Sequence, residues 1–211
     1  MQKKGFFITM EGIDGCGKST QTQLLVQYLN KHHNHTVIKT KEPGGGPASE
    51  KIRYLLLAKD TDISALTELL LLEASRTELF STTIIPALNE GKTIVCERGI
   101  DSTIAYQGYA RGLDHSIIKT LNQTASQNIK PDVTIIFDID PLKSQTRIKA
   151  GDQSLFDRLE KEGIEFQKKV RNGFLEIAKQ EPDRIKIINI ENKSINEVHE
   201  ETIEIIKGLK F

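Results

Sequence analysis

The first residues that could do chemistry lie in the stretch Gly12-Ile13-Asp14-Gly15-Cys16-Gly17-Lys18-Ser19. It fits the pattern G-x-x-x-x-G-K-[ST], in which glycines let backbone N–H groups turn toward an anion. Lys18 can reach the β- and γ-phosphates of a nucleotide, and the hydroxyl of Ser19 can bind Mg²⁺. Apolar residues precede the stretch and leucines follow it at helical spacing. We therefore predict a strand, a phosphate-binding loop (P-loop) and a helix in succession.

Charged residues at two further places indicate a ligand. Glu97 and Arg98 follow the predicted strand 92–96, and ligands bind at the carboxyl ends of strands in open α/β sheets. Arg76 lies within an apolar helical run, where a charged side chain is rarely buried without a partner. Arg76 therefore either binds a ligand or reaches solvent along its aliphatic stem.

Two loops have the composition of ligand-contacting segments. Residues 42–47 place two prolines around three glycines, which allows close backbone approach to a ligand, although a plain connector can look the same. Residues of about 146–158 are polar and carry Arg147, Lys149 and Arg158 around a glycine. We expect a short lid there, and a solvated loop is the alternative.

Alternating strands and helices must position these residues. Apolar, often β-branched runs predict strands at 5–11, 36–38, 92–96, 133–137 and 184–190. Apolar residues at helical spacing predict helices at 18–30, 48–58, 64–88, 102–109, 114–127, 159–180, near Pro141, and after the capping box Ser194–Glu197. This alternation predicts a single α/β domain over residues 1–211, with a parallel sheet between helices on both faces, as in P-loop NTPases.

The bulk composition excludes several classes of protein. The 211 residues include 29 Lys+Arg and 29 Asp+Glu, and this zero net charge argues against nucleic-acid or anionic-membrane partners. The two cysteines, Cys16 and Cys96, give no disulfide framework, so we expect reduced thiols in a cytoplasmic protein. No apolar run of about 18 residues predicts a membrane span, and no signal peptide is evident.

The P-loop leaves three reactions open: a small-molecule kinase, a GTPase switch, or a partner-driven ATPase. The stretch Asn192-Lys193-Ser194-Ile195 lacks the aspartate of the guanine-binding pattern N-K-x-D. A compact neutral domain with strand-end and lid cations favours the kinase. A phosphate acceptor, already largely dianionic near neutral pH, needs a cation such as Arg98. A hydroxyl acceptor needs a general base, for which Glu97 is the candidate.

Five stretches, in order along the chain, resemble the thymidylate kinase family. They are F-I-T-M-E-G-I-D-G-C-G-K-S-T at 7–20, E-P-G-G at 42–45, E-A-S-R at 73–76, E-R-G-I-D-S-T-I-A-Y-Q-G-Y-A-R-G at 97–112 and D-R-L-E at 157–160. The resemblance implies transfer of the γ-phosphoryl group of ATP to dTMP, giving dTDP for dTTP synthesis, with Mg²⁺ as the cofactor. It also implies strand order 2-3-1-4-5 and a homodimer. The helix 64–88, apolar nearly all round in its first half, would be its interface, although a central place in the core would explain the same pattern.

The resemblance assigns expected roles to matching residues. Lys18, Asp14, Arg98 and Arg147 would be catalytic, and Ser19 with Glu97, through water, would serve Mg²⁺. The residues expected to contact ATP are Gly12, Ile13, Asp14, Gly15, Cys16, Gly17, Lys18, Ser19 and Thr20. The expected contacts of dTMP are Asp14 at the 3′-hydroxyl, Pro43, Leu72, Arg76 at thymine O4, Arg98 at the phosphate, Thr103, Tyr106 at the deoxyribose and Gln107 at the base.

One subgroup feature and two departures from the family pattern refine these expectations. The P-loop has no arginine at its variable positions, which resembles the bacterial type and makes Arg147 the main expected lid cation, with Lys149 and Arg158 in support. Leu72 stands where a phenylalanine usually stacks on thymine, which predicts weaker dTMP binding or a looser base preference. Glu97 replaces the usual aspartate before Arg98, and Glu-Arg there also resembles deoxynucleoside kinases, which phosphorylate a 5′-hydroxyl.

Overall fold

The structure is a computed structural model that describes residues 5–32, 36–58, 60, 62–149 and 162–209. Its sheet has five parallel strands in the order β2-β3-β1-β4-β5, which confirms the predicted sheet and its order. The strands are β1 (Phe7–Glu11), β2 (Val37–Lys41), β3 (Thr93–Glu97), β4 (Val133–Asp138) and β5 (Ile185–Asn189). The central strands β1 and β4 are buried along their whole length, because helices cover both faces of the sheet there.

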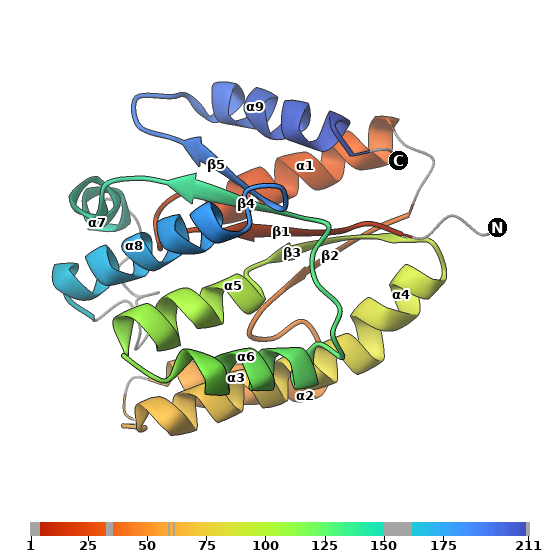
Figure 1. Cartoon of the computed structure of the whole chain (residues 1–211). Coiled ribbons are helices and arrows are strands. Elements are labelled where there is room, and N and C mark those ends of the chain that lie inside the picture. Colours follow the sequence, from red (N-terminus) through yellow and green to blue (C-terminus); the bar gives the residue numbers. More distant parts are fainter. Residues whose placement is uncertain (1–4, 33–35, 59, 61, 150–161, 210–211) are drawn as a thin grey trace.

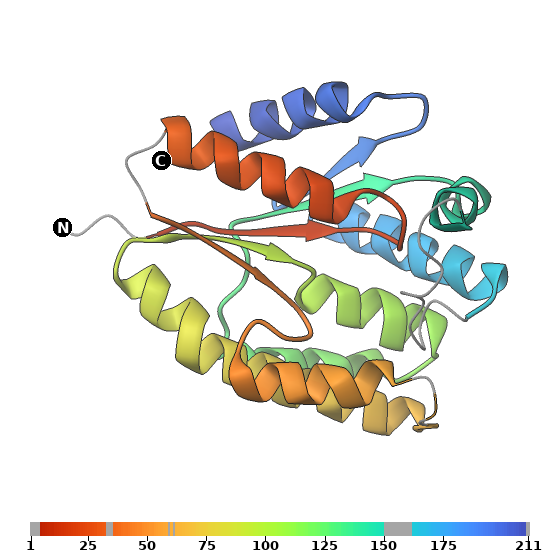
Figure 2. The same cartoon turned by 180° about the vertical axis from the view of Figure 1, so that it is seen from behind.

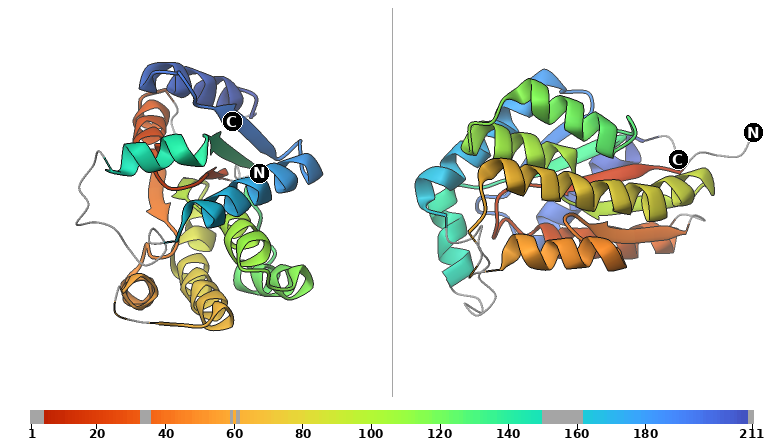
Figure 3. Two further views of the ribbon diagram at one scale, coloured as in Figure 1. Left: turned by 90° about the vertical axis from the view of Figure 1, so that its left-hand side faces the viewer. Right: turned by 90° about the horizontal axis from the view of Figure 1, so that it is seen from below.

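Helices form a layer on each side of the sheet, as predicted. Figure 1 shows α1 (Lys18–His32) and α9 (Ile195–Lys207) together on one face, with Ser194 and Glu197 forming the expected capping box of α9. Figure 2 shows the same layers from behind. The opposite face carries α3 (Ala65–Leu79), α4 (Ile85–Asn89), α5 (Ile100–Thr103), α6 (His115–Ala125) and α8 (Ile164–Gln180). Beside α3 lies α2 (Pro47–Leu57), as the right panel of Figure 3 shows.

Two predicted helices contain wider, π-helical turns. The prediction 64–88 corresponds to α3, the π segment η1 (Phe80–Ile84) and α4, which follow one another without a break. Pro86 lies directly after η1, in the first turn of α4. The prediction 102–109 corresponds to α5 and the π segment η2 (Ile104–Ala110). Such turns re-aim side chains and occur often at functional sites.

The predicted lid begins differently from expectation. Residues 146–149 are the last turn of the helix α7 (Pro141–Lys149) and not a loop, because the helix that starts at Pro141 runs on through them. The rest of the predicted lid, including Arg158, and the side chain of Lys149 lie outside the described residues. In the left panel of Figure 3, α7 crosses in front of the carboxyl ends of the strands. Among the described helices, none is long and apolar enough to cross a bilayer.

Candidate active site

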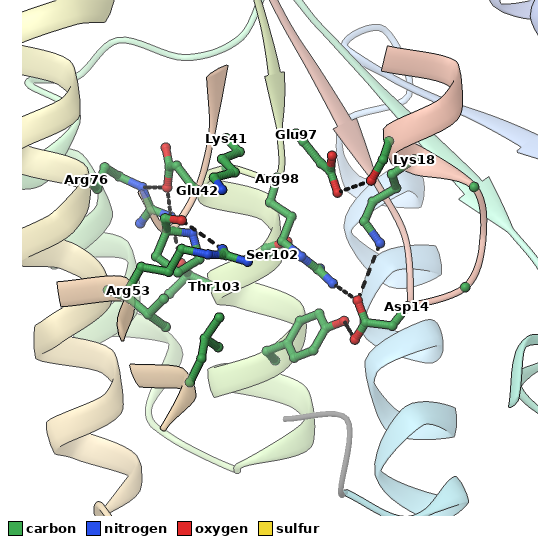
Figure 4. A pocket seen from close by; sticks show the side chains of 18 of the residues that line it. Asp14, Lys18, Lys41, Glu42, Arg53, Arg76, Glu97, Arg98, Ser102 and Thr103 are labelled. Carbon is green, nitrogen blue, oxygen red and sulfur yellow. Dashed lines mark hydrogen bonds and ion pairs between the residues drawn. The ribbon is translucent and has the colours of Figure 1, made fainter. Parts of the chain in front are cut away.

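A cavity of about 470 Å³ opens beside the P-loop. Its walls come from segments far apart in the sequence: the P-loop, the ends of β2 and β3, and the helical segments α2, α3, α5, η2 and α7 (Figure 4). The predicted residues that line it are Asp14, Gly15, Gly17, Lys18, Ser19, Thr20, Pro43, Leu72, Arg76, Glu97, Arg98, Thr103, Tyr106, Gln107 and Arg147. The folded chain therefore gathers most of the predicted site around one cavity.

The P-loop holds its lysine close to its own backbone. Lys18 Nζ donates to the carbonyl oxygens of Gly12 at 3.1 Å and Ile13 at 2.9 Å, and lies 3.6 Å from the Asp14 carboxylate. Gly12 has φ +134°, and an added Cβ would lie 2.7 Å from the carbonyl oxygen of Phe137. Only glycine fits that position, which lets the loop turn tightly against β4.

Helix α7 lies directly on the P-loop. The hydroxyl of Ser144 donates to the carbonyl oxygen of Asp14. Gly15, at φ +74°, faces the same helix, and an added Cβ would lie 2.8 Å from both Ser144 Oγ and Ile148 Cγ1. Arg147, an exposed residue on the last turn of α7, therefore reaches the cavity from a helix seated on the P-loop.

Arg98 is held at the cavity wall in a backbone conformation that is rare for arginine. Its φ is +67°, in the left-handed region, where a non-glycine residue is often a sign of function. Its guanidinium pairs with the Asp14 carboxylate and lies 4.9 Å from the ring centroid of Tyr106. Burial raises the pKa of Asp14, but the charges of Arg98 and Lys18 outweigh it, so this pKa lies below its usual range.

Glu11 supports Arg98 from behind, and the sequence motifs did not single it out. Its buried carboxylate accepts hydrogen bonds from Ser102 N at 3.1 Å and Ser102 Oγ at 2.6 Å, and Ser102 Oγ also accepts from Arg98 Nη1 at 3.3 Å. Burial raises the pKa of Glu11 to about 7. An acidic residue ending a fully buried strand is the signal that could have identified it.

Arg76 is fully engaged with the protein. Its side chain is 2 % exposed, so it does not reach solvent along its stem. Its guanidinium donates four hydrogen bonds of 2.6 to 3.0 Å, to the side chains of Glu42, Glu73, Thr103 and Asn122, and its Nη2 also lies 2.6 Å from Glu42 Oε2. Burial lowers the pKa of Arg76, but the two carboxylates outweigh it, so its pKa is raised and it stays charged.

Ser19 and Glu97 bring two oxygen ligands together at the P-loop end of the cavity. Ser19 Oγ donates to Glu97 Oε1 at 2.9 Å. Hydroxyl and carboxylate oxygens are the ligands that Mg²⁺ prefers, so these residues fit the predicted cofactor. The same contact turns Glu97 toward the P-loop.

Comparison with known proteins gives one family throughout. The family model described as Thymidylate kinase matches residues 10–202. The Thymidylate kinase of Thermoanaerobacter sp. (strain X514) is 42 % identical over 97 % of this chain and 98 % of its own, and that of Chlorobium luteolum is 46 % identical over 91 % and 92 %. The crystal structure of thymidylate kinase from Ehrlichia chaffeensis has a TM-score of 0.78 and 40 % identity, covering 97 % of this chain and 99 % of that one.

This chain belongs to the thymidylate kinase family. The resemblance in its five sequence stretches is therefore confirmed. Among the expected ATP contacts, the P-loop of this chain turns two side chains away from the cavity. Ile13 and Cys16 are buried in the core, so only their backbone could meet a nucleotide.

Two basic residues that line the cavity, Lys41 and Arg53, were not predicted from the sequence. Lys41 ends β2, and Arg53 on α2 donates from Nη1 to the carbonyl oxygen of Pro43 at 2.9 Å. The signal for Lys41 was the one used for Arg98, a charged residue at the carboxyl end of a parallel strand. Arg53 gave no such signal, because α2 meets the cavity only through tertiary packing.

Proposed function

We propose that this chain transfers the γ-phosphoryl group of ATP to dTMP, giving ADP and dTDP for dTTP synthesis. Membership of the thymidylate kinase family supports the assignment. The observation in the site that supports it best is Arg98, a cation at the cavity wall within contact distance of the P-loop residue Asp14. An arginine fork suits a phosphate acceptor, which needs positioning and charge neutralisation and no general base.

The contacts of Glu97 weigh against the alternative acceptor, a sugar hydroxyl. A deoxynucleoside kinase would need a carboxylate free to take the 5′-hydroxyl proton. Glu97 Oε1 is instead bonded to Ser19 of the P-loop. We assign Glu97 and Ser19 to Mg²⁺, Glu97 through water. Bound there, the ion would neutralise charge on the ATP phosphates.

We assign the remaining site residues to different parts of the two substrates. Lys18 would exchange its two carbonyl contacts for the ATP phosphates, and Asp14 with Tyr106 would border the deoxyribose. Arg147, with Lys149 and Arg158 from the predicted lid, would add positive charge during transfer. Pro43, Leu72, Arg76, Thr103 and Gln107 would enclose the base, because they line the part of the cavity between α3, η2 and the loop after β2.

The test measures ADP release from ATP and Mg²⁺ with dTMP, dUMP, dCMP or thymidine as the sole acceptor. We expect fast turnover with dTMP, slower turnover with dUMP and none with thymidine. In Arg98→Met, KM for dTMP should rise about 100-fold, because a partly buried charge contact to the phosphate is lost. Thymidine, which lacks the phosphate, should inhibit both enzymes equally. Turnover of thymidine in place of dTMP would overturn the proposal.

We also propose a cytoplasmic homodimer that forms through the outer face of α3. Leu66 and Leu70, one helical turn apart, are 51 % and 50 % exposed, and the neighbouring α2 exposes Tyr54 and Leu55. Both cysteines are free thiols buried in the fold, in keeping with a reducing compartment. Light scattering should give a dimer for the wild type and a monomer for Leu66→Glu/Leu70→Glu. A monomeric wild type at micromolar concentration would contradict the proposal.

A further inference from the structure

Gln107, at the base end of the cavity, is bonded to Glu68, a buried carboxylate behind the cavity wall. Gln107, on η2, lines the cavity and is 1 % exposed, and its Nε2 donates to Glu68 Oε1 at 2.8 Å. Glu68, on the first turn of α3, is also 1 % exposed. Within the described residues, Gln107 Oε1 accepts no hydrogen bond from the protein. One end of this amide is therefore fixed, and the other end is open to a ligand.

Arg111 forms an ion pair with Glu68 and holds its carboxylate in place. Its Nε lies 3.2 Å from Glu68 Oε1 and its Nη2 lies 3.1 Å from Glu68 Oε2, a two-point contact. Arg111 is itself fixed by an ion pair of 2.5 Å with Glu162 and by the ring of Phe166, 4.7 Å from its guanidinium carbon. An ionised carboxylate offers only acceptors. Glu68 must therefore face the NH₂ group of Gln107 and never its carbonyl oxygen.

We propose that Glu68 is a positioning residue that sets the base specificity of the enzyme. By holding Nε2 of Gln107, it leaves Oε1 as a hydrogen-bond acceptor on the cavity side. Thymine and uracil carry an N–H donor at N3, whereas cytosine carries a lone pair there. The fixed amide therefore accepts from thymine or uracil and repels cytosine. The proposal rests on the proposed function, which places the base of dTMP in this part of the cavity.

The state of Arg76 makes this acceptor important. Four hydrogen bonds and a further contact of 2.6 Å between Nη2 and Glu42 Oε2 already occupy the guanidinium of Arg76, so a base can reach it only by sharing a donor. Gln107 Oε1 needs no such rearrangement. The choice between thymine or uracil and cytosine at N3 therefore depends on the orientation of the Gln107 amide, which is fixed before the base binds.

The decisive variant is Glu68→Gln, which offers Gln107 both a donor and an acceptor and so releases its amide to turn. We expect the ratio of the dCMP inhibition constant to the KM of dTMP to fall about 10-fold, as expected when a buried polar pair is mismatched. The dUMP-to-dTMP ratio should stay constant, because both bases carry N3–H, and kcat with saturating dTMP should change less than KM. An unchanged dCMP ratio in a folded Glu68→Gln enzyme overturns the proposal.

Glu162→Gln is the matched control, because it removes the other carboxylate of Arg111 and leaves the Glu68–Gln107 contact intact. In Glu162→Gln, the ratio of the dCMP inhibition constant to the KM of dTMP should equal that of the wild type. A fall as large as that in Glu68→Gln would show that general disturbance around Arg111 causes the effect, and it would overturn the proposal. If Glu68→Gln does not fold, Glu68→Asp retains the charge for Arg111 but shortens the side chain away from Gln107, and the same fall is expected. Gln107→Ala separates the two proposals: an unchanged KM for dTMP there would mean that the base lies elsewhere, and the site assignment itself would fail.

Discussion

The two ends of the cavity hold their charges in different ways. At the phosphate half, formed by Asp14, Lys18, Ser19 and Arg98, the ion pair between Asp14 and Arg98 is 20 % and 17 % exposed and its members belong to the site itself. At the base half, formed by Arg76 and Gln107 with their partners Glu42, Glu68 and Glu73, every residue is at most 5 % exposed. The partners of Arg76 there include Asn122, a residue of α6 outside the cavity lining.

This difference separates the work of the two halves. In the phosphate half, Lys18 contacts backbone carbonyl oxygens and Arg98 contacts Asp14. An anionic ligand that binds these cations must replace those protein partners. In the base half, Arg76 and Gln107 are held by buried protein groups. Their positions are therefore fixed before a ligand binds, and binding needs little further ordering of side chains. We therefore expect substitutions in the phosphate half to lower the rate, and those in the base half to lower stability or change selectivity.

The largest effect is expected for Arg147 on α7, and it would show that this helix also contributes to the phosphate half. Arg147→Met should lower kcat about 10³-fold, because a cation that stabilises the transferring phosphoryl group is typically worth at least that factor. Lys143→Met is the matched control, since Lys143 is an exposed cation on the same helix that pairs with Glu191. Single-turnover kinetics would measure both. Equal rates for the two variants would place Arg147 outside the reaction.

Next in size is the loss of the buried arginine. Arg76→Met leaves two carboxylates without a cation in the base half, and the free energy of unfolding should fall by about 3 to 5 kcal/mol. Lys179→Met removes a cation of an exposed ion pair with Glu176 and should cost less than about 1 kcal/mol. Urea unfolding of both variants gives the difference. Similar losses would show that burial of the pair does not matter.

The pH dependence of stability tests the support behind the phosphate half. The pKa of Glu11 is about 7 in the folded protein and near 4.5 in the unfolded chain. As the pH rises, the unfolded chain therefore loses this proton at a lower pH than the folded protein does. The contribution of Glu11 to stability should therefore be largest below pH 4.5 and fall by about 3 kcal/mol as the pH rises to 7. Glu11→Gln should remove this slope, whereas Glu204→Gln, an exposed partner of Lys207, should keep it. A slope that persists in Glu11→Gln would assign it to other groups.

The smallest effect concerns the fit of the base half to its ligand. Leu72 lines the cavity and offers contact without a ring that can stack. Leu72→Phe should lower KM for dTMP several-fold, because an aromatic pair adds about 1 kcal/mol. Calorimetric binding of dTMP would check the value independently of turnover. An unchanged KM would show that a leucine serves this base half equally well.

Much of the fold and of the phosphate half could be predicted from the sequence because both depend on local patterns. Alternating apolar runs identified the five strands, and the spacing within residues 12–19 identified the P-loop. The position of Arg98 followed from the rule that ligands meet the carboxyl ends of parallel strands. The order of the strands, however, came from family resemblance, since periodicity does not say which strands are neighbours.

The base half could not be predicted in the same way because its partners are distant in sequence. Arg76 meets Glu42, Thr103 and Asn122 only after α3, α5 and α6 have packed. The prediction that it reads thymine O4 did not anticipate that its donors would already be in use. The π-helical turn that aims Tyr106 and Gln107 also left no periodic signal, because one wider turn does not change the pattern of apolar residues.

The close seat of α7 on Gly15 limits how this enzyme can supply positive charge. Any side chain at position 15 would need the space that Ser144 and Ile148 already occupy, at a backbone angle that disfavours it. An arginine at this position of the loop would therefore not fit beside α7 as it lies in this structure. To be accommodated, an arginine introduced at position 15 would have to displace α7, the helix that carries Arg147.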